Sequence, residues 1–169
     1  MIAEILADKT TKSKDKTTAL SAQIASGHIG VEEIIEFCEK AKDPLKATCI
    51  ESLEYATKAD PELLGKKGFA FVVNQLESKS PRVKWESARV IGNTAAQHKS
   101  QLDAAIVGLL RNSEDEGTVV RWSSAYALGE IYKLKTKHQA DLKSAFESII
   151  LREEKNSIRK IYQTAMKSK

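Results

Sequence analysis

Apolar residues recur along this chain at the spacing of amphipathic α-helices, and no stretch shows the strict alternation that is typical of a β-strand. Turns of about two to six residues separate the apolar stretches, so consecutive helices are expected to lie antiparallel. The pattern therefore predicts an all-α fold. The expected helices span residues 31–41, 44–58, 61–77, 81–97, 101–111, 118–135, 140–152 and 157–167.

Three of these helices begin with the same pair of signals. Asp43–Pro44, Asp60–Pro61 and Ser80–Pro81 each place a capping residue directly before a proline. A short polar side chain can accept a hydrogen bond from the first turn, and proline is well tolerated at the first helical position. These pairs predict the starts of three helices.

The chain contains an internal repeat. Residues 119–132 read VVRWSSAYALGEIY, and residues 82–94 read RVKWESARVIGNT, so that the two segments match at an offset of 37 residues. A fixed period of this size indicates stacked helical hairpins. The matched pairs are Val83 and Val120, Lys84 and Arg121, Trp85 and Trp122, Ser87 and Ser124, Ala88 and Ala125, Ile91 and Leu128, and Gly92 and Gly129.

A simpler form of the repeat, an aliphatic residue followed directly by a basic residue, occurs four times along the chain. This pair occurs at residues 45–46, 83–84, 120–121 and 158–159, at intervals of 38, 37 and 38 residues. Another apolar residue follows each aliphatic residue eight positions later, on the same face of the helix. These later residues are Leu53, Ile91, Leu128 and Met166.

These repeats resemble the HEAT repeat family of armadillo-type alpha-solenoids. The resemblance rests on Pro81, Val83, Lys84, Ala88, Ile91 and Gly92 in one repeat, and on Val120, Arg121, Ala125, Leu128, Gly129 and Ile131 in the next. It implies a right-handed alpha-alpha superhelix of about four hairpins over residues 31–169. The weakly amphipathic stretches before the repeats predict an N-terminal helical cap over residues 1–30. The inner helices are then those near residues 44–58, 81–97, 118–135 and 157–167.

The resemblance also implies a structural ladder of charged residues. In this family an acidic residue in the inter-helix turn lies six positions before the base and pairs with it. Asp115 fits this pattern for Arg121, and Glu153 fits it for Arg159. Ser78 before Lys84, and the equivalent lysine before residue 46, depart from it.

Inner helices of stacked hairpins line an extended surface that is suited to binding. We expect this surface to be concave and to carry the residues two, six and ten positions after the aliphatic residue of each repeat. In the first repeat these are Ala47, Glu51 and Tyr55, and in the fourth they are Lys160, Thr164 and Ser168. Trp, Tyr and Arg anchor many interfaces. The two central repeats therefore predict a partner-binding patch, rimmed in part by Glu86. Its residues are Trp85, Arg89, Asn93, Trp122, Tyr126 and Glu130.

A different role for the two tryptophans stays open from the sequence alone. Trp85 and Trp122 can instead pack between repeats and cover Gly92 and Gly129, since large aromatic side chains are usually mostly buried.

The sequence contains no constellation that predicts catalysis, a cofactor or a metal site. His28, His98 and His138 lie in or next to expected loops and share no repeat register, and no nucleophile or phosphate-binding motif occurs. Cys38 and Cys49 do not form a metal-binding motif, and we expect two semi-buried thiols in a reducing compartment. The protein is therefore expected to be non-enzymatic.

Charge and hydropathy limit the expected cellular location of the protein and the kinds of partner that it can bind. A net charge of +4 tolerates an anionic partner without requiring one. The N-terminal residues lack the basic and apolar regions of a signal peptide, and no apolar run is long enough for a membrane span, so we expect a cytoplasmic protein without a membrane partner.

The leading hypothesis for function is a scaffold that binds a protein segment on the concave face. The alternative is a nucleic-acid-binding protein related to the HEAT-like alkylpurine DNA glycosylases, in which aromatic, basic and acidic residues share the inner surface. A chromophore lyase subunit with a HEAT-like fold is a third hypothesis, for which no specific residue argues.

Overall fold

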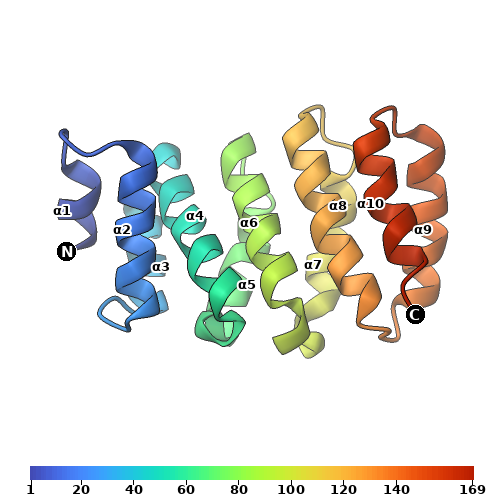
Figure 1. Ribbon diagram of the computed structural model, residues 1–169, viewed down its shortest axis with the longest axis horizontal. Coiled ribbons are helices and arrows are strands. Elements are labelled where there is room, and N and C mark those ends of the chain that lie inside the picture. Colours follow the sequence, from blue (N-terminus) through green and yellow to red (C-terminus); the bar gives the residue numbers. More distant parts are fainter.

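The computed structural model describes all 169 residues as a row of helices without strands (Figure 1). The all-α solenoid expected from the sequence is confirmed. The α-helices are α1 (Ile2–Ala7), α2 (Ser13–Ala25), α3 (Val31–Lys40), α4 (Asp43–Ala59), α5 (Gly65–Gln75), α6 (Pro81–Thr94), α7 (Leu102–Asn112), α8 (Thr118–Lys133), α9 (Gln139–Arg152) and α10 (Asn156–Met166). Short 3-10 turns occur at η1 (Pro61–Leu64), η2 (Ala95–Gln97) and η3 (Lys99–Gln101).

The helices form two layers. The even-numbered helices α2, α4, α6, α8 and α10 pack side by side in one layer, and α3, α5, α7 and α9 lie behind them (Figure 1). We call the exposed side of the even-numbered helices the inner surface. Helices α1 and α2 form a shorter fifth hairpin at the N-terminal end, and α2 extends the inner layer by packing on α4.

The proline signals mark helix starts with two differences from the prediction. The Ser80 hydroxyl accepts a hydrogen bond from the amide of Val83 and caps α6. Asp60 caps the 3-10 turn η1, and α5 begins only at Gly65, so the helix predicted over residues 61–77 is divided. Asp43 is the first residue of α4 and makes no capping hydrogen bond, because the chain already becomes helical after Lys42.

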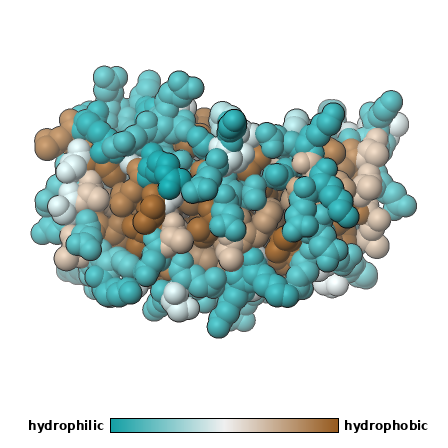
Figure 2. Space-filling view, turned by 180° about the vertical axis from the view of Figure 1, so that it is seen from behind, coloured by the Kyte–Doolittle hydropathy of each residue, from teal (hydrophilic) through white to brown (hydrophobic).

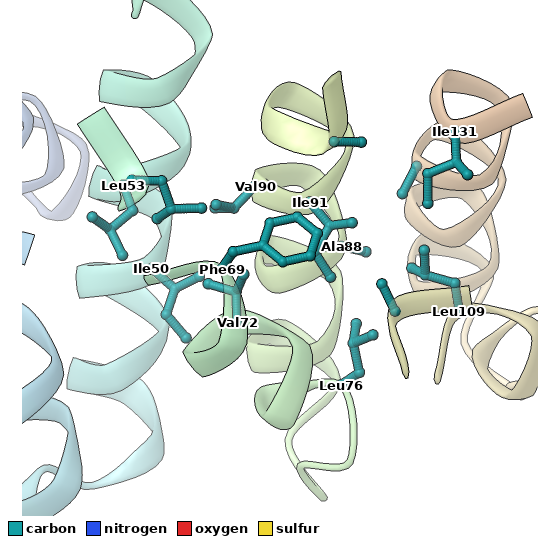
Figure 3. Packing of buried hydrophobic residues seen from close by; sticks show 14 of the residues in the cluster. Ile50, Leu53, Phe69, Val72, Leu76, Ala88, Val90, Ile91, Leu109 and Ile131 are labelled. Atoms are coloured by element: carbon teal, nitrogen blue, oxygen red, sulfur yellow. The ribbon is translucent and has the colours of Figure 1, made fainter. Parts of the chain in front are cut away.

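One hydrophobic core runs the length of the row between the two layers. Phe69 of α5 lies at its centre, with the side chains of α4 and α6 around it (Figure 3). Leu109 of α7 and Ile131 of α8 continue the core toward the C-terminal hairpins. Each hairpin thus buries its apolar sides on its neighbours, which is the source of stability in a repeat array.

The start of α4 departs from the predicted register. Leu45 was expected in the core and Ala47 on the inner surface, but Leu45 is 40% exposed and Ala47 is buried. The six-residue α1 is too short to cover the beginning of α4. Leu45 therefore borders an open groove that Met1 and Phe37 also line.

Ala88 of α6 and Ala125 of α8 are fully buried, as the repeat predicted. We expect Ala88→Leu and Ala125→Leu each to lower the free energy of unfolding by about 1–3 kcal/mol, because extra methylene groups force neighbouring helices apart. Urea unfolding measures the loss. The exposed Ala104 of α7 offers a control, since Ala104→Leu should leave stability within about 0.5 kcal/mol. Unchanged midpoints for both buried variants would contradict this packing.

Candidate functional site

An aromatic and cationic stack lies on the inner surface between α6 and α8. The rings of Trp122 and Tyr126 stack with centroids 6.1 Å apart and an interplanar angle of 13°. The guanidinium carbon of Arg89 lies 5.5 Å from the centroid of the Trp122 ring, within the range of a cation–π interaction. Trp122 nevertheless keeps 37% of its surface exposed. A large apolar side chain is thereby held in place while part of its surface stays open to solvent.

A chain of hydrogen bonds fixes this stack to three inner helices. The Tyr126 hydroxyl donates to Asn93 Oδ1 at 2.7 Å. Asn93 Nδ2 in turn donates to the backbone oxygen of Glu54 at 3.1 Å and to Thr57 Oγ1 at 3.3 Å. Burial, with the nearby charges of Glu130 and Glu54, raises the pKa of Tyr126 to about 12, so the phenol stays a neutral donor.

A glycine makes room for the Tyr126 ring. A Cβ atom built at Gly92 would lie 2.8 Å from Tyr126 Cδ1, so a larger residue in α6 would displace the ring. Gly129 faces Ile161 and Ala165 of α10 instead. The two glycines are therefore not covered by Trp85 and Trp122, which was the alternative that the sequence left open.

Trp85 lies on α6 but does not join the stack. Its indole nitrogen donates to Glu86 Oε1 at 2.8 Å, and the two tryptophan rings make no aromatic contact with each other. Trp85 is half-buried. Glu86 was predicted on the rim of the patch, but it is only 3% exposed because it lies within the packed inner layer.

The environment of Glu86 is unfavourable for its charge. Burial raises the pKa of Glu86 to about 7, and the charges of Glu51 and Glu54 add to this increase. The Trp85 hydrogen bond and the charge of Arg89 act in the opposite direction. Oε2 of Glu86 is buried and has no hydrogen-bond partner.

Glu130 lies at the C-terminal side of the stack. It pairs with Lys133 within α8 at 2.9 Å and is partly exposed. The groove between α8 and α10, about 300 Å³ in volume, is lined by Glu130 and Tyr126 together with Ile161 and Thr164 of α10. The structure thus brings Arg89, Asn93, Trp122 and Tyr126 into direct contact and places Glu130 beside them.

The charged ladder joins neighbouring hairpins, which corrects the predicted pairing. Asp115 Oδ2 contacts Lys84 Nζ at 2.8 Å, and Glu153 Oε2 contacts Arg121 Nε at 2.9 Å. Arg121 reaches Asp115 only through the backbone oxygen, at 3.0 Å. Arg159 forms no ion pair.

Hydrogen bonds within the turns explain why Asp115 and Glu153 pair with basic residues of the preceding hairpin. Asp115 Oδ1 accepts a hydrogen bond from the amide of Gly117, and Glu153 Oε1 accepts one from the amide of Lys155. One oxygen of each acid is thus held within its own turn, and the other contacts the base of the preceding hairpin. Burial raises the pKa of both acids, but their hydrogen bonds and the paired cations outweigh it and lower the pKa overall.

We expect Arg121→Ala to lower the free energy of unfolding by about 2–3 kcal/mol, since it leaves the buried Glu153 carboxylate without its charged partner. Arg121→Ala combined with Glu153→Gln should recover part of that loss, because no unpaired charge remains. Urea unfolding at neutral pH measures both. The native pKa of Glu153 is lowered, so this pair stabilises above the ordinary value of 4.5 and its contribution is lost as the pH falls further. An equal loss in the single and double variants would contradict a structural role for the pair.

Both cysteines are more buried than the sequence suggested, and one of the three histidines, His98, is buried as well. Cys38 and Cys49 are free and fully buried, and the Cys38 contact together with burial raises the pKa of Cys49. His98 lies between η2 and η3, next to a loop as expected, but it is buried and stacks on Phe69 with ring centroids 4.5 Å apart. No three His, Cys, Asp or Glu side chains gather in a geometry that could hold a metal ion.

Sequence reasoning missed the importance of Glu54. Its backbone oxygen anchors Asn93, and its carboxylate contributes to the pKa shifts of Tyr126 and Glu86. Glu54 lies nine residues after Leu45, outside the three positions per helix that the repeat selects for the inner surface. Only the packing of α4 against α6 reveals its place.

Neither a protein-family model nor a curated protein matches the sequence. Solved structures match it by shape. One is a computationally designed armadillo repeat protein for modular peptide recognition, with a TM-score of 0.75 and 16% identity over 99% of this chain and 80% of that chain. The complex of CpcE and CpcF of phycocyanin lyase from Nostoc sp. PCC7120 matches with a TM-score of 0.71 and 16% identity, over 98% and 95% of the two chains.

A third similar structure is a designed armadillo repeat protein in complex with the peptide (KR)4, with a TM-score of 0.59 and 14% identity over 99% of this chain and 97% of that chain. At these identities the likeness concerns the fold. The protein has the fold of the armadillo and HEAT-like alpha-solenoids, as its repeats predicted. None of its helices combines the length and the apolar character that crossing a bilayer requires.

Proposed function

We propose that this protein is a non-enzymatic interaction module, and that it binds a segment of a partner protein along the inner surface. The binding patch consists of the six residues predicted from the repeat. They are Trp85, Arg89, Asn93, Trp122, Tyr126 and Glu130.

The observation that carries this proposal is the exposed side chain of Trp122, which stacks on Tyr126 and lies within cation–π distance of Arg89. Interfaces draw much of their affinity from a few Trp, Tyr and Arg side chains at their centre. The hydrogen bonds of Tyr126 to Asn93, and of Asn93 to α4, fix these side chains before a partner arrives. A fixed site loses less conformational entropy on binding than a mobile one.

The similar structures agree with a role in protein interaction. Two designed armadillo repeat proteins recognise or hold peptides, and CpcE and CpcF form a complex with each other. An extended segment suits a row of parallel inner helices, since successive side chains of the segment can contact successive helices.

Nucleic-acid binding is less well supported by the same surface. The charges of Glu54 and Glu130 act on Tyr126 of the aromatic stack, and negative charge at this place would repel phosphates. A duplex binder should hold DNA tightly at low salt and lose affinity steeply as salt rises. Titration of fluorescent duplex DNA at low salt separates the two functions.

Capture experiments with matched variants test the proposed function. The purified protein is immobilised, and partners captured from a lysate are quantified by mass spectrometry. Trp122→Ala, alone and together with Trp85→Ala, removes the aromatic side chains from the inner surface. The control is Val107→Ala with Leu151→Ala, which removes two exposed apolar side chains from the outer helices α7 and α9. Figure 2 shows this opposite side of the row, where apolar residues lie between polar margins.

We expect the inner-surface variants to lose a defined set of partners that the control retains. Circular dichroism and thermal unfolding must first show that each variant is folded. A folded double variant that captures the same partners as the unaltered protein would rule out the patch. If the double variant unfolds, the single Trp122→Ala change decides, because Trp122 is exposed enough to be removed without loss of the core.

A further inference from the structure

An apolar groove lies open at the N-terminal end of the row, where the six-residue helix α1 is the first element (Figure 1). Residues of α1, α3 and α4 line this groove, and its volume is about 700 Å³. Phe37 of α3 is half-buried in its wall, whereas Met1 and Leu45 are 62% and 40% exposed. The groove therefore leaves a continuous apolar surface in contact with solvent.

The other repeats show that the position of Leu45 is normally covered. The residues that correspond to it are Val83, Val120 and Ile158, and each is at most 1% exposed because neighbouring helices pack over it. The short α1 leaves Leu45 open instead. Burial of such a surface is favourable, and an exposed apolar patch with a polar rim is typical of an interaction site.

The face of α3 at this groove carries charges of both signs in a fixed order. The side chains that line the groove from α3 are Glu33, Glu36, Phe37 and Lys40, at the i, i+3, i+4 and i+7 spacing of one helical stripe. The two acids lie toward the start of the helix, and Lys40 is its last residue. Along the helix axis Glu33 and Lys40 are about 10 Å apart, with Phe37 close to the midpoint.

These charged side chains have no ion-pair partner within the chain, since every ion pair of the structure joins other residues. Glu33 Oε1 accepts a hydrogen bond from the amide of Gly30 at 2.9 Å, which holds the carboxylate in place and leaves its other oxygen free. Glu36 and Lys40 are exposed. Both signs of charge can therefore pair with groups of another molecule.

We propose that this groove receives a second copy of the protein, through an antiparallel pair of α3 helices related by a two-fold axis beside Phe37. The axis puts Glu33 of each copy opposite Lys40 of the other, so that two equivalent ion pairs form. The two Phe37 side chains meet at the centre. Met1 and Leu45 of both copies border them and lose their contact with solvent.

Charge complementarity favours a second copy over other occupants. A two-fold interface requires a patch that is complementary to itself. This patch fulfils the requirement, because rotation exchanges its acidic end with the end that carries Lys40 and Lys42. A uniformly basic or acidic segment would meet a charge of its own sign at one end. Since α3 belongs to the outer layer, the dimer leaves the inner surface of both copies free for the partner of the proposed function.

Sedimentation equilibrium of the intact chain tests the proposal. We expect a mass near 18.7 kDa at about 1 µM and near twice that value at about 200 µM, because an interface of this modest size should have a dissociation constant on the order of 10 µM. Trp122→Ala on the inner surface should leave this equilibrium unchanged.

Two charge reversals test the symmetry of the interface. Lys40→Glu and Glu33→Lys each place like charges opposite one another at both ion pairs, so each alone should weaken the dimer by about tenfold or more. An equal mixture of the two variants restores opposite charges at both pairs and should form a heterodimer. Lys143→Glu, at an exposed position of α9, is the matched control and should dimerise as the unaltered protein does.

Circular dichroism must first show that the variants are folded, since Glu33→Lys also removes the acceptor for the Gly30 amide. If that variant does not fold, Lys40→Glu alone decides. The proposal is overturned by a monomer at about 1 mM, by a dimer that Lys40→Glu does not weaken, or by two folded variants that form no heterodimer. A dimer that Trp122→Ala disrupts would also overturn it, because the copies would then meet on the inner surface. Failure of the proposed function is separate, since that is measured by partner capture.

Discussion

Phe146→Ala should lower the free energy of unfolding by about 3–5 kcal/mol, the largest single loss that we expect for this protein. Phe146 of α9 is fully buried. Its ring meets Tyr162 of α10 edge-on at a centroid distance of 4.7 Å, and it meets Tyr132 of α8 at 5.2 Å. The ring therefore joins three helices, and its removal leaves a cavity that rigid helix backbones fill only in part.

Urea unfolding followed by circular dichroism measures this loss. Phe146→Leu, which keeps most of the volume, should cost less than half as much. Leu151→Ala is the control on the same helix, because Leu151 is 89% exposed and its truncation should change stability by no more than about 0.5 kcal/mol. A loss under about 1 kcal/mol for Phe146→Ala would mean that the three helices do not share this ring.

Glu86→Gln is expected to act in the opposite direction and to stabilise the protein at alkaline pH. The unfolded chain releases the Glu86 proton near the ordinary value of 4.5, whereas the folded chain keeps it up to a pKa of about 7. Stability therefore falls as the pH rises between these two values and stays reduced above them. Removing the carboxylate should raise the free energy of unfolding by about 3 kcal/mol at pH 8, and by about 1 kcal/mol or less at pH 5.

Urea unfolding at pH 5 and pH 8 tests the expected difference between the two conditions. Glu147→Gln, at an exposed position of α9, provides the control and should show no dependence on pH. If Glu86→Gln changed stability equally at both pH values, its effect would come from packing and not from charge.

The repeat pattern predicted the helical array because the repeated residues are the ones that neighbouring helices bury. The residues that match between the two central repeats, such as Ala88 and Ala125, face neighbouring helices, and their identity is constrained by the space between those helices. The same register placed Arg89, Trp122 and Tyr126 on one exposed side, and the structure brings these three side chains into contact. Whether a partner binds there is the proposal that the capture experiments test.

Features that depend on contacts between hairpins could not be derived from one repeat considered alone. The six-residue spacing suggested that Asp115 pairs with Arg121, but the acid is turned toward Lys84 by its own turn. Position along α6 placed Glu86 on the rim of the patch beside Trp85, but packing within the inner layer buries its carboxylate. In both cases the residue that pairs with the side chain or buries it belongs to a neighbouring hairpin, whose exact offset is not encoded in the period.

The ladder between hairpins has a consequence for local opening of the chain. Glu153 belongs to the turn of the last hairpin but neutralises Arg121 of the hairpin before it, and Asp115 neutralises Lys84 in the same way. The last hairpin therefore cannot detach without leaving a neighbouring charge unpaired. Amide hydrogens of α8 and α10 should exchange with solvent together as one cooperative unit, whereas α2 and α4, which no such pair joins, should exchange more independently.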